Sequence, residues 1–316
     1  MKMNKTNIIG NWMFLIALAV SVLFISGCSS YGGGSLFNAH TGSEALRVSF
    51  MDNAPPKAVY SNTAFTVGVL LENYGAYEID NGILVIGADN FESSIITSSS
   101  DKATFTIQGR EDTRTFVGGR DVKFFTMRAP DIGSENEQEA GISVKTCYKY
   151  TTTAQTSVCI DKSMYSSDNV KSACTFKNKI SLSSQGAPVV VNEIDIAKIF
   201  ESESKMNFTF TIHISNEGSG FVVNPSQTSN FCSSSGSLSS SAFGRAIVSA
   251  TLGFKPLDCS PRNYADLSQN DEDFVTCTSQ SMNVNDSAYV TSLKINVTYG
   301  YVNTDSTTIR ILRLNS

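Results

Sequence analysis

The sequence predicts an all-β protein whose main part consists of two β-sandwiches. Three observations support this prediction. Apolar and polar residues alternate with a period of two through most of the chain after residue 43, which is typical of strands that bury one face. Helical periodicity is nearly absent. Residues 65–75 match residues 208–218 without a gap, and both segments end in Asn-x-Gly, which indicates a turn after a strand.

Each half of the chain contains a series of short strand candidates separated by Gly, Asn, Asp and Ser. In the first half they are 46–50, 65–71, 83–86, 104–107, 122–127, 142–150 and 157–160. In the second half they are 189–191, 194–199, 208–214, 246–252, 273–278, 288–301 and 307–314. Residues 194–203 also fit a helix. Such a series is typical of a sandwich, and its repetition indicates two copies of one domain.

The first 28 residues have the pattern of an export signal. Lys2 and Lys5 precede an uncharged apolar run that ends in Ile25-Ser26-Gly27-Cys28. These four residues resemble the lipobox of prokaryotic lipoproteins. The resemblance implies cleavage before Cys28 and attachment of lipid to Cys28. The alternative is an uncleaved membrane span, although the apolar stretch is short for a helix that needs about 20 residues to cross a bilayer.

We therefore expect four segments: a signal peptide at 1–27, a flexible tether at 28–42, a first sandwich at 43–184 and a second at 185–316. The Ser- and Gly-rich tether cannot bury enough apolar surface to fold. The signal contains two of the 24 basic residues and none of the 29 acidic ones, so the remainder carries a formal charge of −7. No Lys/Arg cluster is present, which disfavours nucleic-acid binding.

Six cysteines remain after Cys28, and they are candidates for disulfides in an exported protein: Cys147, Cys159, Cys174, Cys232, Cys259 and Cys277. If the candidates at 142–150 and 157–160 form a hairpin, Cys147 and Cys159 face the same side of it, so we predict that they pair. Cys259 and Cys277 form the second predicted pair. Cys174 and Cys232 are left as a staple between the sandwiches, or as buried free thiols.

Several short segments resemble a known family. They are Asn73-Tyr74-Gly75, Asn216-Glu217-Gly218, Cys147-Tyr148-Lys149-Tyr150 with Val158-Cys159-Ile160, and Gln185-Gly186-Ala187-Pro188-Val189. Together they resemble the CARDB-type Ig-like tandem domains of archaeal and bacterial surface proteins. The resemblance implies Ig-like sandwiches that act outside the cell as interaction or structural modules. It supplies no catalytic residues.

The sequence offers little for catalysis. His40 lies in the tether, and His213 lies on the outward face of a strand, so a positioned histidine base is not expected. No Cys-x-x-Cys is present and neither histidine is close in sequence to a cysteine, so a zinc site is not expected. We expect no metal and no cofactor. A carboxylate pair of the glycosidase type forms only in the fold, and the sequence singles out no such pair.

Three Asn-x-Ser/Thr triplets are candidates for glycosylation, at Asn207, Asn285 and Asn296. The sequence therefore favours a lipid-anchored cell-surface protein, held at the membrane through its anchor. It would act without catalysis as a structural or adhesion module, or as a module that binds other surface proteins or glycans. The alternative is a substrate-binding lipoprotein or an accessory subunit of an extracellular hydrolase or membrane complex. That alternative needs a concave site with aromatic side chains. Four tyrosines (Tyr148, Tyr150, Tyr299 and Tyr301) are candidates, but their phase along the strands places them in the core.

Overall fold

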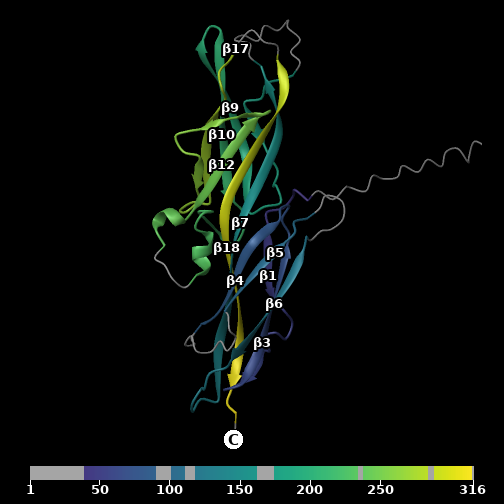
Figure 1. Cartoon of the computed structure of the whole chain (residues 1–316), viewed down its shortest axis with the longest axis vertical. Coiled ribbons are helices and arrows are strands. Elements are labelled where there is room, and N and C mark those ends of the chain that lie inside the picture. Colours follow the sequence, from purple (N-terminus) through teal and green to yellow (C-terminus); the bar gives the residue numbers. More distant parts are fainter. Residues whose placement is uncertain are drawn as a thin grey trace, which may run out of the picture. The chain divides into compact units, whose positions relative to one another are not determined.

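The computed structural model describes residues 39–89, 101–110, 118–161, 174–233, 238–283 and 288–314. One compact unit extends from Asn38 to Ser316, and its described part is nearly all β (Figure 1). Two short 3-10 turns, η2 (Thr228–Cys232) and η3 (Ser240–Ala242), interrupt the strands. No helix in the described ranges is long and apolar enough to cross a membrane.

The described strands form three sheets. One has the order β1-β3-β6, one β14-β16-β10-β9-β8 with β17 on β10, and one β13-β12-β18-β7-β4-β5 with β2 and β11 on β18 and β15 on β12. The bounds are β1 Leu46–Phe50, β2 Ala58–Tyr60, β3 Ala64–Asn73, β4 Ile79–Asp89, β5 Lys102–Ile107, β6 Arg120–Arg128, β7 Glu137–Ile160, β8 Lys179–Ser181, β9 Val189–Ser202, β10 Lys205–Asn216, β11 Phe221–Val223, β12 Arg245–Leu252, β13 Lys255–Pro256, β14 Asp258–Cys259, β15 Tyr264–Asp266, β16 Glu272–Thr278, β17 Met282–Asn283 and β18 Tyr289–Leu312.

The centre of the fold is a ribbon of two strands, β7 and β18, which pair antiparallel over 24 residues each. The pairing extends from Tyr289 opposite Ile160 to Leu312 opposite Glu137. β4 pairs with the first part of β7, and β12 pairs with the first part of β18. Because the two strands are antiparallel, β4 and β12 lie towards opposite ends of the ribbon (Figure 1).

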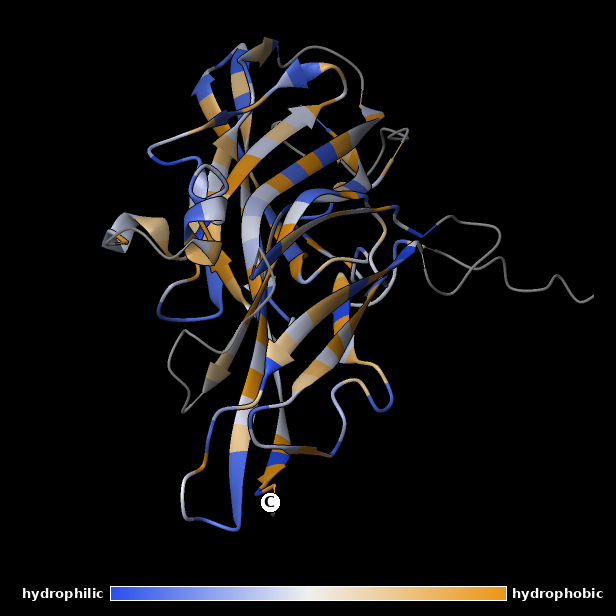
Figure 2. Cartoon of the chain, turned by 60° about the horizontal axis from the view of Figure 1, so that its bottom comes forward, coloured by the Kyte–Doolittle hydropathy of each residue, from blue (hydrophilic) through white to orange (hydrophobic). Residues whose placement is uncertain are grey.

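The other two sheets pack on the ribbon to form sandwiches. Tyr148 of β7 accepts a hydrogen bond from Leu46 N in β1, and Tyr299 of β18 accepts one from Val189 N in β9. Along β7 and β18, apolar and polar residues alternate between the two faces (Figure 2). The apolar face joins both neighbouring sheets in one continuous core, so the prediction of an all-β sandwich fold is confirmed.

The two segments matched by the internal repeat are β3 and β10 with the turns that follow them. β3 lies between β1 and β6, and β10 lies between β9 and β16. Leu46 of β1 pairs with Asn73, and Val189 of β9 pairs with Asn216; each residue of the second pair lies 143 positions after its counterpart. The matched segments therefore occupy equivalent places in their sheets.

The expected seam between residues 184 and 185 does not divide the sheets. β7 comes from the first half of the chain and β18 from the second, yet both run through both sandwiches. The expected strands 142–150 and 157–160 are one strand, as are 288–301 and 307–314. Residues 194–199 are part of β9, so the helix that also fitted this segment is absent there. That each sandwich folds by itself stays a prediction.

Candidate functional site

All six cysteines in the described residues form disulfides, and Cys259–Cys277 is the pair that the sequence predicted. The other two expected pairings are wrong. Cys147 bonds to Cys232, and Cys159 bonds to Cys174. Three disulfides are typical of a protein exported to an oxidising compartment.

The expected pairing of Cys147 with Cys159 failed because β7 contains no hairpin. The two cysteines lie twelve residues apart in one extended strand, which separates them by about 40 Å. The predicted staple between Cys174 and Cys232 is wrong because both cysteines bond to β7 instead: Cys232 bonds near its middle, and Cys174 bonds near its C-terminal end. Cys232 arrives there on the segment between β11 and β12, which contains η2 and η3.

The predicted modification sites are described only in part. Cys28 and Asn285 lie outside the described residues. Asn207 is partly exposed in β10, and its amide donates to Glu201. Asn296 is partly exposed in β18, and its Oδ1 accepts a hydrogen bond from Thr153. Glycosylation at these sites stays a prediction.

The Asn-x-Gly turn of the first half forms a hydrogen-bonded structure that we call the first corner: Asn73, Gly75, Tyr77 and Tyr150. Asn73 Oδ1 accepts a bond from Gly75 N (2.9 Å), and Asn73 Nδ2 donates to Tyr77 O (2.8 Å). Tyr77 N donates to Tyr150 Oη (3.0 Å). A Cβ on Gly75 would collide with that hydroxyl, which is why this position needs glycine.

The second half contains the same arrangement, the second corner: Asn216, Gly218, Gly220 and Tyr301. Asn216 Nδ2 donates to Gly220 O (2.9 Å), and Gly220 N donates to Tyr301 Oη (2.9 Å). That hydroxyl donates in turn to Asn216 Oδ1 (3.1 Å). A Cβ on Gly218 would collide with Tyr301 Oη. The corners tie the turns of both halves to the ribbon.

The four tyrosines of the ribbon are core residues, as the strand phase predicted. Tyr148, Tyr150, Tyr299 and Tyr301 are at most 2% exposed, and neighbouring rings lie 5.9 to 6.2 Å apart. Burial raises the pKa of the Tyr148, Tyr150 and Tyr299 hydroxyls well above the usual value, and raises the pKa of Tyr301 to about 12. The hydroxyls therefore stay protonated and act as structural hydrogen-bonding groups.

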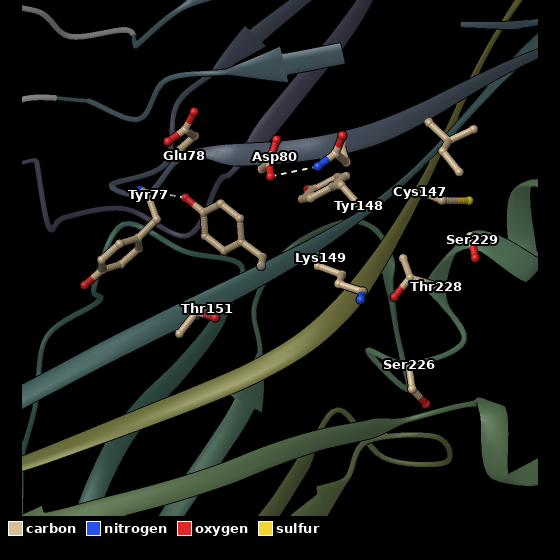
Figure 3. Close-up of a pocket in the computed structure, with 13 residues that line it drawn as sticks. Tyr77, Glu78, Asp80, Cys147, Tyr148, Lys149, Thr151, Ser226, Thr228 and Ser229 are labelled. Atoms are coloured by element: carbon tan, nitrogen blue, oxygen red, sulfur yellow. Dashed lines mark hydrogen bonds between the residues drawn. The ribbon is translucent and has the colours of Figure 1, made fainter. Parts of the chain in front are cut away.

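A polar groove of about 500 Å³ lies over the ribbon beside the first corner. Three segments line it: residues 77–83, residues 147–151 of β7 and residues 226–229 at η2. Figure 3 shows Glu78 and Asp80 on one side of β7 and Ser226, Thr228 and Ser229 on the other. The groove was not predicted, because its walls come from segments about 150 residues apart in sequence and meet only in the fold.

Most polar groups of the groove are already engaged in the fold. Glu78 accepts a hydrogen bond from Gln108 (2.6 Å), and Asp80 accepts bonds from Asn81 and Thr106. Thr228 donates to the backbone of the segment that carries it. None of the thirteen lining residues is a histidine, so its serine hydroxyls have no imidazole base in the lining. The groove has the chemistry of a binding surface for a small polar ligand.

An apolar surface lies at the end of the second sandwich that carries the hairpin between β12 and β13. We call the side chains of Phe254, Pro256, Met282 and Tyr289 the apolar tip. Together with polar residues that include Lys255, Gln280 and Asn283, they line a hollow of about 420 Å³. Leu252 pairs with Lys255, and Gly253 has φ +59°, so a two-residue turn presents Phe254 at its apex. Phe254 is 104% exposed and Tyr289 is 40% exposed.

Comparisons with known proteins assign no family to the chain. No protein-family model matches it, and no curated protein matches it. Among solved structures it is similar to the sporulation control protein Spo0M of Bacillus subtilis (10% identity, 54% of this chain, 80% of that chain, TM-score 0.17). It is also similar to the SafA pilin of Salmonella enterica in complex with the SafB chaperone (11% identity, 75% of this chain, 86% of that chain, TM-score 0.18). A third similar structure is the CupB6 tip adhesin of Pseudomonas aeruginosa (10% identity, 87% of this chain, 96% of that chain, TM-score 0.13). At these TM-scores the likenesses support no conclusion about function.

Proposed function

We propose that this chain is an exported, lipid-anchored surface protein that binds a partner protein or glycan through the apolar tip and performs no catalysis. The exposure of Phe254 carries the proposal. Its phenyl ring is 104% exposed at the apex of a tight turn. In the free protein the apolar surface of the ring faces water, and a partner that covers the ring removes this surface from water, which is favourable.

The surroundings of Phe254 support a contact larger than one side chain. Tyr289, Met282 and Pro256 border the same hollow, and exposed aromatic residues together with Met are enriched in binding surfaces. The segment that follows the hairpin is fixed by Cys259–Cys277, which joins β14 to β16 in the other sheet of this sandwich. The tip is therefore presented on a braced support, which lowers the entropy lost on binding.

The anchoring part of the proposal depends on Cys28 and the residues before it. We expect the full chain to partition into the detergent phase of a phase-separating detergent. The Cys28→Ser variant is expected to keep its signal peptide or to appear in the aqueous phase. Equal partitioning and equal processing of both forms would show that no lipid is attached at Cys28.

The binding part is tested by crosslinking on intact cells, followed by purification of the full chain. We expect wild-type protein to give a discrete crosslinked product that Phe254→Ser and Tyr289→Ser reduce strongly. Phe124→Ser is the matched control, because Phe124 is 63% exposed but lies on β6 in the other sandwich. Equal loss in all three variants, or no loss in any, would remove the apolar tip from the proposal.

The groove supports a second function, capture of a small polar ligand. Glu78, Asp80 and Lys149 bring charges of both signs to its lining. In the same experiment, Lys149→Ala should leave partner crosslinking unchanged if the tip is the binding surface. If Lys149→Ala abolishes crosslinking and Phe254→Ser does not, the partner contacts the groove and not the apolar tip.

A further inference from the structure

A cluster of metal-ligating side chains lies on the outer face of the sheet formed by β8, β9, β10 and β16. Glu193 and Asp195 of β9 and His213 of β10 place one ligand atom each within 4.8 Å of one another. His213 Nε2 lies 2.9 Å from Asp195 Oδ2. All three side chains are partly exposed, and the cluster is separate from both the groove and the apolar tip.

A β-bulge in β9 puts these side chains on one face. His213 pairs with Glu193, but Ile214 pairs with Val191, so Asn192 has no partner in β10. Val189 and Val191 are buried before the bulge, and Ile194 and Ile196 are buried after it. If Asn192 were an ordinary paired residue and the alternation continued through it, Glu193 and Asp195 would share the inner face with Val191.

The first half of the chain has no bulge at the equivalent place. β1 pairs with β3 in one unbroken register from Leu46 opposite Asn73 to Phe50 opposite Val69. The bulge is therefore an addition of the second half, and its effect is to turn two carboxylates outwards, next to an imidazole. Bulges that redirect side chains in this way are enriched at functional sites.

A cation already occupies this position. Lys179 Nζ lies 2.6 Å from Glu193 Oε1 and 3.6 Å from Asp195 Oδ1. The lysine comes from β8, a strand of three residues that pairs with β9, and its side chain is 56% exposed. Exposed ion pairs of this kind are weak because solvent screens them, so the ammonium can swing into solvent when another cation binds.

The ligand set indicates which cation fits. An imidazole nitrogen with two carboxylate oxygens suits zinc and similar transition metals, whereas calcium and magnesium prefer oxygen ligands alone. Two ligands of a tetrahedral zinc ion lie about 3.4 Å apart when each bond is about 2.1 Å. The ligand atoms lie within 4.8 Å of one another, so the most separated pair must approach by up to about 1.4 Å. His213 Nε2 and Asp195 Oδ2, which lie 2.9 Å apart, must instead move slightly apart. Rotation of the partly exposed side chains permits both changes.

We propose that Glu193, Asp195 and His213 bind a transition-metal dication such as Zn²⁺, with Lys179 as the internal cation that the metal displaces. Three ligands on an exposed face leave a coordination position for water. The site is independent of the proposed function at the apolar tip, and it departs from the expectation, drawn from the sequence, that the protein binds no metal.

The test is isothermal titration of the full chain in detergent with ZnCl2, after EDTA treatment and without a histidine tag. We expect one saturable site per chain and no comparable binding of CaCl2. His213→Ala should weaken zinc binding by about tenfold or more, because it removes a direct ligand. Lys179→Met should strengthen binding by roughly threefold to fivefold, because the competing ion pair is weak.

Two further variants make the result specific. Glu193→Gln keeps the size of the side chain and should also weaken binding. His40→Ala removes the other histidine, which lies outside the cluster, and should leave binding unchanged. The proposal is overturned if neither wild type nor Lys179→Met shows saturable binding. It is equally overturned if His213→Ala keeps wild-type affinity or if His40→Ala abolishes binding.

Discussion

The two corners join the turns of the two halves to the same ribbon with nearly the same hydrogen bonds. In the first corner, Asn73 is fully buried and binds Tyr77 O and Ile107 O. In the second corner, Asn216 is partly exposed and its second bond goes to the side chain of Asp271. The same motif is thus sealed inside the core in one half and open to solvent in the other.

The halves differ more in what surrounds the corners. The second half adds the segment with η2 and η3, which is tied to β7 through Cys147–Cys232, and the bulge in β9. The groove and the metal-ligating cluster both depend on these additions. The features that both halves share therefore build the scaffold, whereas the groove and the metal-ligating cluster each need a feature that only the second half has.

The largest expected difference concerns the disulfides. Cys147 and Cys232 lie 85 positions apart, whereas Cys159 and Cys174 lie 15 apart. A disulfide that closes a longer loop removes more entropy from the unfolded chain. We therefore expect the free energy of unfolding to fall by about 4.5 kcal/mol when Cys147 and Cys232 are both replaced by Ala, and by about 3 kcal/mol when Cys159 and Cys174 are both replaced by Ala. Urea unfolding followed by circular dichroism measures both. If loss of Cys159–Cys174 lowers the free energy of unfolding more than loss of Cys147–Cys232, the disulfide that ties the added segment to β7 is not the main covalent stabiliser.

The next difference separates the corners. Asn73→Ala leaves Gly75 N, Tyr77 O and Ile107 O without a side-chain partner in a buried place, so we expect a loss of roughly 2 to 3 kcal/mol in the free energy of unfolding. Asn216→Ala should cost about 1 kcal/mol, because water can replace its amide. Urea unfolding followed by circular dichroism measures the free energy of unfolding of both variants. Equal costs would show that the corners do not differ in burial as described.

The smallest difference concerns two tyrosine hydroxyls. Tyr299 Oη interacts with Thr152 Oγ1 (3.1 Å) and Val189 N (3.3 Å), whereas Tyr148 Oη accepts one long bond from Leu46 N (3.5 Å). We expect Tyr299→Phe to lower the free energy of unfolding by about 1 to 1.5 kcal/mol and Tyr148→Phe by less than about 0.5 kcal/mol. A greater effect at Tyr148 would show that its hydroxyl has a stronger partner.

The sequence predicted local features well. Period-two alternation located most long strands, and the repeated Asn-x-Gly located both corners, because the glycine and the amide act within a few residues. The continuity of β7 could also have been predicted: residues 151–157 contain no Gly, Pro, Asn or Asp that would indicate a hairpin. The partner of Cys147 could not have been predicted from the sequence, because Cys232 reaches β7 on a segment that has no counterpart in the first half.

The candidate sites were also beyond the sequence, for a physical reason. The groove and the metal-ligating cluster each join segments that are distant along the chain, and the cluster depends on a bulge that changes the phase of β9 by one residue. Alternation alone would have placed Glu193 and Asp195 on the same face as Val191.

Each half of the chain completes the other through the ribbon of β7 and β18. Removal of residues 304–316 takes away the part of β18 that pairs with residues 137–145 of β7 and with β2. Hydrogen exchange of this truncated chain, compared with the full chain, tests the claim most directly. We expect β3, β4 and β6 in the first half to lose protection, while β10 and β16 keep it. Full protection of β3 and β6 after truncation would contradict the claim and would support a first sandwich that folds independently within residues 43–184.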